Sequence, residues 1–145
     1  MKNYSYQHTV SFEETNLVGN VYYTNYVKWQ GICREFFLKD KAPDIIDLLQ
    51  RGLYLVTTKV SCQYLSELFA FDRVEIKMFS GGTKLNKVKM LFEYWKVSED
   101  STPLELVCRG EQEIACLYKE DGQLKVIEVP DSLKKALKKY EVVNK

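Results

Sequence analysis

Between residues 24 and 40, apolar side chains recur every three or four positions, as they do along one face of an α-helix. Tyr26, Trp29 and Cys33 carry this spacing, and the segment is too apolar to lie in solvent. A shorter helix is expected over residues 43–52, which begin with a proline near the first turn and end with a glycine. The pattern therefore predicts a long buried helix followed by a short one.

Most of the remaining chain alternates between apolar and polar residues, which indicates β-strands. One strand is expected before the long helix, over residues 4–12. After Pro130 the spacing becomes helical again, and Asp131 or Ser132 is expected to cap this final helix over residues 131–140. Further strands are predicted over residues 53–65, 72–80, 87–97, 106–118 and 124–129, with turns over residues 80–86, 99–105 and 120–123.

Consecutive strands joined by tight turns make an antiparallel sheet. The long helix must be buried, and a sheet that wraps around it is the simplest way to do so. We therefore expect an α+β fold in which residues 1–145 form one domain, with an antiparallel sheet around a long central helix and a helix at the C-terminal end.

The composition fits an ordinary globular protein. Apolar residues make up 46% of the chain and charged residues 28%, and the formal net charge is +1. This balance gives no electrostatic reason to expect nucleic acid or an anionic membrane as a partner. No apolar run resembles a secretory signal or a membrane span, so a cytoplasmic location is expected.

Cysteine and histidine are too sparse for a typical zinc site. The chain has four cysteines, none in a C-x-x-C pair, and one histidine. We therefore expect buried free thiols and no bound metal.

The junction before the long helix contains polar residues that a hydrophobic core would not require. Residues 14–22 read E-T-N-L-V-G-N-V-Y, and residues 29–35 read W-Q-G-I-C-R-E. This junction resembles the hotdog-fold thioesterases of the 4-hydroxybenzoyl-CoA thioesterase and YbgC-like group, whose signature is roughly D-x-x-G-H-V. It has Asn16 and Asn20 where that signature has an Asp and a His. The two runs are more similar still to the enediyne-biosynthesis polyketide thioesterases.

This resemblance implies a hotdog domain that hydrolyses a long polyene or β-ketoacyl thioester. The acyl chain would be held by the acyl carrier protein of a polyketide synthase, and the freed β-keto acid could lose CO₂ to give a methyl ketone. It implies no cofactor beyond the phosphopantetheine or CoA that carries the substrate, and a homo-oligomer, either a dimer or a tetrameric dimer of dimers. Two alternatives stay open: a general acyl-CoA thioesterase and a non-catalytic acyl-binding protein.

Thioester hydrolysis without an acid or an imidazole needs donors for the oxyanion. The free N–H groups at the start of the long helix, near Tyr22 or Tyr23, offer them. The Asn16 amide can donate to the thioester oxygen or hold the attacking water, although Asn is also a common turn or cap residue.

Arg34 is the second polar candidate, on the same helix flank as Tyr26 and Gln30. It lies 11 residues after Tyr23, which is about 16 Å along a helix. We therefore expect it to reach the site of a neighbouring subunit or to bind the β-keto end of the substrate. An internal salt bridge, for example with Glu14, is the alternative.

Other candidates follow from position. One of the two threonines on the next strand should face the pocket, aromatic residues of the long helix line either a tunnel or the core, and the lysines of the last helix could dock an acidic carrier protein. Catalytic candidates are Asn16, Arg34 and the backbone N–H of Tyr23; substrate-binding candidates are Gly19, Asn20, Tyr22, Tyr26, Gln30, Thr57 and Thr58; Glu35 is a possible alternative base.

Overall fold

The structure, a computed structural model, describes residues 1–142. These residues form a 6-stranded antiparallel sheet in the order β1-β3-β4-β5-β2, with β6 paired to β5. The strands are β1 (Tyr4–Thr9), β2 (Leu53–Tyr64), β3 (Arg73–Lys84), β4 (Lys87–Val97), β5 (Pro103–Glu120) and β6 (Gln123–Val126).

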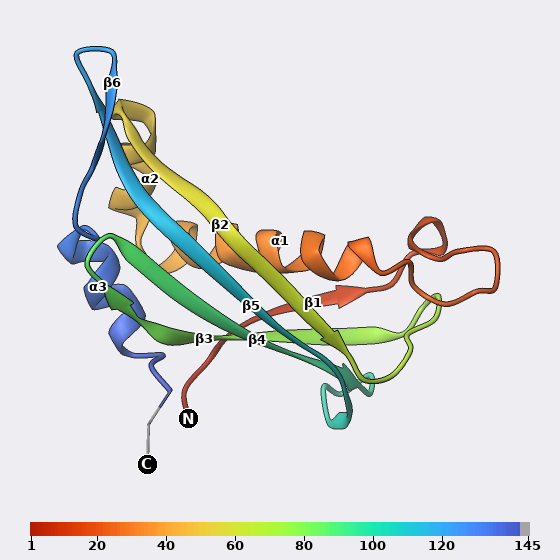
Figure 1. The fold of residues 1–145 in the computed structure, drawn as a ribbon. Helices are drawn as coiled ribbons and strands as arrows, with labels where there is room; N and C mark the ends of the chain where they lie inside the picture. The colour runs from red at the N-terminus through yellow and green to blue at the C-terminus, as the bar shows by residue number, and fades with distance from the viewer. Residues whose placement is uncertain (143–145) are drawn as a thin grey trace.

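The long helix α1 (Thr24–Lys41) lies against one face of the curled sheet (Figure 1). Its inward side chains Trp29, Cys33 and Phe37 are fully buried and join the core with residues of β3, β4 and β5. Apolar positions at helical spacing are buried here as the pattern requires. The predicted fold class, a sheet wrapped around a long central helix, is therefore confirmed.

The short helix α2 (Pro43–Arg51) and the final helix α3 (Asp131–Lys138) pack at one end of the sheet (Figure 1). Gly52 ends α2 with φ at 135°, a conformation that favours glycine. The predicted caps of α3 are wrong, because Pro130 is its N-cap residue and no side chain caps it. No helix within residues 1–142 is long and apolar enough to cross a membrane.

Strand boundaries differ from the prediction where the backbone leaves simple alternation. The first strand ends at Thr9, and residues Phe12–Glu14 form a short 3₁₀ helix. The glycines predicted to form a turn lie inside β3, where the register shifts between Ser80 and Gly82. An extra residue in a strand forms a bulge, which is typical of such glycines. The third strand therefore continues to Lys84, and the fifth is longer than predicted at both ends.

Strand β2 is an open edge of the sheet. It pairs with β5 on one side and with no other strand among the described residues. Most of its side chains are exposed on both faces, including Tyr54, Val56 and Val60. A long exposed edge strand that carries apolar side chains is a surface on which a second chain can pair.

Candidate active site

A tight turn before α1 fixes the orientation of the Asn16 amide. The Gly19 N–H donates to the Asn16 carbonyl at 2.9 Å, and the Asn16 N–H donates to the Asn20 carbonyl at 2.8 Å. Gly19 has φ at 98°, which a side chain would disfavour. The Val18 N–H donates to Asn16 Oδ1 at 3.0 Å. That bond identifies the side-chain oxygen, so the free Asn16 group is its NH₂, a donor.

At the start of α1, one of the two predicted backbone donors is already bonded. The Tyr22 N–H donates to the Glu14 carbonyl at 2.9 Å, so Tyr22 is not an oxyanion donor. The Tyr23 N–H has no acceptor within residues 1–142. No acidic residue lies in the first turn of α1 to offset the positive end of the helix dipole. Of the two predicted backbone donors, the structure therefore leaves Tyr23 available.

The buried carboxylate of Glu14 holds this junction to the core. It accepts hydrogen bonds from Trp29 Nε1 at 2.8 Å and from the Ser11 N–H at 2.9 Å, and His8 Nε2 lies 2.7 Å away. Burial opposes ionisation, but the hydrogen bonds from Ser11, His8 and Trp29 outweigh it and lower the pKa of Glu14. The Glu14 carboxylate therefore binds Ser11, His8 and Trp29, and the salt bridge to Arg34 that was the alternative role for Arg34 is not formed.

Asn20 ties the same turn to the loop between β2 and β3. Its Nδ2 donates to Glu67 Oε1 at 3.2 Å, and its backbone pairs with Phe69. Its Oδ1 is buried without a partner among the described residues. Asn20 therefore positions the junction and keeps an unused acceptor there.

Halfway along α1, the Arg34 guanidinium lies between α1 and the sheet. Its Nη1 donates to Thr57 Oγ1 on β2 at 2.9 Å and to Gln112 Oε1 on β5 at 3.2 Å. Burial lowers the pKa of Arg34, although a guanidinium stays protonated in proteins. Gln112, which is 3% exposed, was not among the predicted site residues. The available signal was a polar residue at an inward position of a strand.

Gln30, one turn before Arg34, is fully buried. Its Nε2 donates to the Ser61 carbonyl and to Cys62 Sγ, both at 3.2 Å. A Cβ added to Gly110 would lie 2.0 Å from that nitrogen, so the Gln30 side chain needs a glycine opposite it. Tyr26 is likewise buried, between the rings of Trp29, Tyr64 and Tyr94. Within one chain, Tyr26 and Gln30 are therefore buried next to the site, and neither side chain lies at an open surface.

The two threonines of β2 make their contacts on opposite faces, at the point where the register with β5 shifts between Thr57 and Lys59. Thr57 faces α1 and binds Arg34. Thr58 Oγ1 donates to the carbonyl and the carboxylate of Glu113 on the other face. Thr58 therefore does not share the Arg34 cluster with Thr57. Glu35 is exposed and forms no side-chain hydrogen bond or ion pair within residues 1–142.

The aromatic residues of α1 and its start divide into two groups. Tyr26, Trp29 and Phe37 belong to the core, whereas Tyr22, Tyr23 and Phe36 are exposed. Of these six residues, the exposed ones, Tyr22, Tyr23 and Phe36, are therefore the ones available to line an apolar tunnel within one chain.

All four cysteines are free, as expected. Cys62 is half-buried on β2, and the neighbouring Cys108 thiol lowers the pKa of Cys62 to about 7. Within residues 1–142, no three His, Cys, Asp or Glu side chains come together as a metal site needs.

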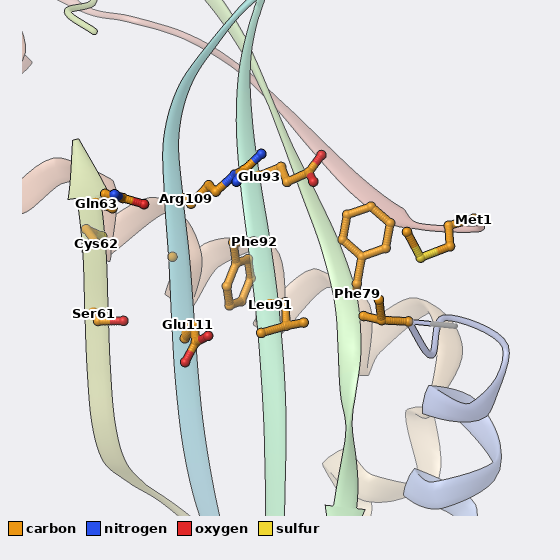
Figure 2. A pocket seen from close by; sticks show the side chains of 12 residues that line it. Met1, Ser61, Cys62, Gln63, Phe79, Leu91, Phe92, Glu93, Arg109 and Glu111 are labelled. Carbon is orange, nitrogen blue, oxygen red and sulfur yellow. The ribbon is translucent and has the colours of Figure 1, made fainter. Parts of the chain in front are cut away.

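A groove lies on the other face of the sheet. It has a volume of about 490 Å³. Figure 2 shows Phe79, Leu91 and Arg109 reaching into it from β3, β4 and β5. Neither Asn16 nor Arg34 lines it. The polar groups suited to thioester chemistry thus form two separate sets in one chain, about 16 Å apart along α1, and neither set lines this groove.

Comparison with known proteins gives a consistent result. A family model described as the thioesterase-like superfamily matches residues 10–137. The dynemicin thioesterase, whose crystal structures reveal induced-fit and allosteric effects upon polyene binding, is 40% identical, with a TM-score of 0.92 over 99% of this chain and 100% of that chain. A 1,4-dihydroxy-2-naphthoyl-CoA thioesterase from Synechocystis has the same fold at 14% identity, with a TM-score of 0.80 over 94% of this chain and 96% of that chain. A 4-hydroxybenzoyl-CoA thioesterase also has this fold, at 18% identity and with a TM-score of 0.79 over 94% of this chain and 99% of that chain.

Proposed function

Because the chain belongs to the thioesterase-like superfamily and is a thioester hydrolase, we propose that it releases a long polyene or β-ketoacyl chain from an acyl carrier protein of a polyketide synthase. The freed β-keto acid then loses CO₂ to give a methyl ketone. The 40% identity along the whole chain to a thioesterase that binds a polyene supports this substrate class.

Hydrolysis proceeds through a tetrahedral oxyanion. Water adds to the thioester carbonyl, the carbon–sulfur bond breaks, and the products are a carboxylic acid and the carrier thiol. The Tyr23 N–H and the Asn16 NH₂ stabilise the negative oxygen, and one such donor is worth on the order of 3 kcal/mol in the barrier. The positive end of α1 adds to this effect. Thioesters are reactive enough for positioned donors and water to suffice without a carboxylate base.

A second copy of the chain completes the site. Arg34 binds Thr57 on the open edge strand β2, so pairing of two β2 edges places each Arg34 next to the neighbouring subunit. In this dimer, the Arg34 guanidinium of one protomer lies towards the Asn16 turn of its partner. The two groups are separated within one chain, and the dimer brings them together. A dimer of dimers is built from the same unit.

The observation that carries the proposal is the orientation of Asn16. Its oxygen accepts a hydrogen bond from the Val18 N–H, which leaves the Asn16 NH₂ as a free donor in the turn before α1, and the Tyr23 N–H at the start of α1 is free as well. An amide oriented in this way presents its NH₂ as a donor, and an amide is too weakly basic to act as a general base.

The test is thiol release from a β-ketoacyl carrier-protein thioester and from the matching acyl-CoA. We expect Asn16→Ala to lower the rate by about 10²–10³-fold, and Asn16→Asp to lower it as well. The Asp variant is the matched control, because it keeps the acceptor for the Val18 N–H but removes the donor. Full activity in Asn16→Asp would replace the donor mechanism with a carboxylate base.

Carrier choice separates the remaining alternatives. Faster release from the carrier protein than from CoA supports the polyketide role, and the reverse order indicates a general acyl-CoA thioesterase. Acyl binding without turnover of either thioester would identify a binding protein.

A further inference from the structure

Arg34 is a partly buried cation whose protein partners are all neutral. Nη1 donates to a hydroxyl, Thr57 Oγ1, and to an amide oxygen, Gln112 Oε1. The guanidinium forms no ion pair within residues 1–142. The exposed Glu35 raises the pKa of Arg34 through space, against the larger effect of burial, but makes no hydrogen bond to it.

The guanidinium also has donors to spare. Nε is buried without an acceptor, and Nη2 makes no hydrogen bond among the described residues. An unsatisfied buried donor costs about 1–3 kcal/mol, and more when it is charged. A fold that keeps such a charge uncompensated has it available for a ligand of opposite charge.

We infer that Arg34, held by Gln112 and Thr57, forms a carboxylate-binding subsite for the head group of the released acid. Gln112 is a positioning residue that orients the guanidinium without neutralising it. This inference rests on the proposed function, because it assigns the subsite to the acid that hydrolysis produces.

The position of Gln112 suits this role. It lies in the middle of β5, opposite Val60 of β2 and Met90 of β4, so its backbone is fixed by neighbours on both sides. Its side chain is nearly fully buried, which limits its rotamers. A Glu at this position would also accept from Nη1, but it would pair with Arg34 and cancel the charge that a carboxylate ligand requires.

The test compares binding of dodecanoate and of the neutral ketone dodecan-2-one to the full-length protein by calorimetry. We expect wild type to bind dodecanoate more tightly than the ketone. Gln112→Glu is expected to weaken dodecanoate binding by about 10-fold, the loss of one charge-assisted contact, and to leave ketone binding unchanged. Gln112→Met, which lacks the acceptor but adds no charge, should lie between wild type and Gln112→Glu.

Thr58→Val is the matched control. It lies beside Thr57 but on the other face of β2, bound to Glu113, and dodecanoate affinity should not change. If Gln112→Glu fails to fold, Gln112→Met and Thr57→Val carry the test, since both remove a neutral acceptor of Arg34 without adding a charge.

Equal losses for acid and ketone would mean that Gln112 shapes the pocket only, and unchanged dodecanoate affinity in every variant would place the acid elsewhere. Either result overturns the subsite. Binding needs no turnover, so failure of the proposed function is seen separately, as absence of thiol release by wild type. Thiol release with no preference for dodecanoate would reject the subsite alone.

Discussion

Glu14 and Arg34 both bring a charge to α1, and their surroundings differ. The Glu14 carboxylate is saturated by hydrogen bonds from Trp29, Ser11 and His8, all within the fold. Arg34 has two neutral acceptors and donors left over. A buried charge whose capacity is used inside the fold stabilises structure, whereas one with capacity to spare is suited to bind a ligand. The two residues should therefore respond to mutation in opposite ways.

The largest expected effect is on catalysis, in Arg34→Met. Hydrolysis should fall by about 10²–10³-fold, because a charge-assisted contact in the site is lost. Stability should change little: Met has a helix propensity close to that of Arg, and the unsatisfied Nε disappears. The melting temperature should stay within about 4 °C of wild type. Steady-state kinetics and thermal unfolding of the same preparation measure both.

Lys28→Met is the control, since Lys28 is an exposed cation on the same helix. Its activity should match wild type. If Arg34→Met unfolds the protein, or if Lys28→Met loses as much activity, Arg34 would belong with Glu14 as a structural charge.

Glu14→Ala should show the opposite behaviour. It leaves the Trp29 and Ser11 donors without an acceptor in a buried place, and the free energy of unfolding should fall by about 3 kcal/mol. Chemical denaturation measures this loss. Glu13→Ala is the control, because the neighbouring Glu13 is exposed, and it should stay within about 0.5 kcal/mol of wild type. A Glu14→Ala protein as stable as Glu13→Ala would mean that the hydrogen-bonded carboxylate adds nothing to the fold.

The elements that carry these two charges could be predicted from the sequence, but not every detail of the strands. The long helix and the order of the strands follow from periodicity, a local property. The helix was predicted nearly to its ends, whereas β1, β3, β5 and β6 end at other residues than predicted. The bulge at Ser80–Gly82 was missed, because glycines signal a turn and a strand irregularity equally well. The Asn16 and Tyr23 candidates came from the resemblance of one continuous motif.

Contacts between distant segments could not be read from the chain. Gln112 is 78 residues from Arg34, and the two meet because of the register of β5. The alternative donor Tyr22 was wrong because its N–H binds the Glu14 carbonyl, which a 3₁₀ helix brings close. Thr57 and Thr58 could be assigned to opposite faces from alternation, but which of them faced α1 depended on that same register.

Two glycines, Gly110 and Gly31, lie next to Gln30, which is one helical turn before Arg34. Gly110→Ala would force Gln30 out of its bonds to Ser61 and Cys62 and should cost about 1–3 kcal/mol in unfolding free energy. At Gly31, on α1 next to Gln30, an added Cβ meets nothing within 4 Å in one chain. Gly31→Ala should therefore stabilise α1 by up to about 1 kcal/mol. Denaturation at several protein concentrations measures both. Destabilisation by Gly31→Ala that depends on concentration would show that a second subunit covers this part of α1.

The smallest expected effect is the acid sensitivity of Glu14. Hydrogen bonds lower the pKa of its carboxylate below the ordinary value of 4.5, despite burial. The folded state therefore binds this proton less readily than the unfolded state. The stability contributed by the charge is present above about pH 4.5 and is lost as the pH falls through the lower, folded pKa.

In Glu14→Gln this contribution is absent at every pH. The difference in unfolding free energy between wild type and Glu14→Gln should hence be constant near neutral pH and shrink below about pH 4.5. Arg34→Met should give no such change relative to wild type, because a guanidinium keeps its charge over this range. An equal acid response in the Glu14 and Arg34 variants would mean that the two charges are coupled through the fold, and that the division into a structural and a ligand-binding charge does not hold.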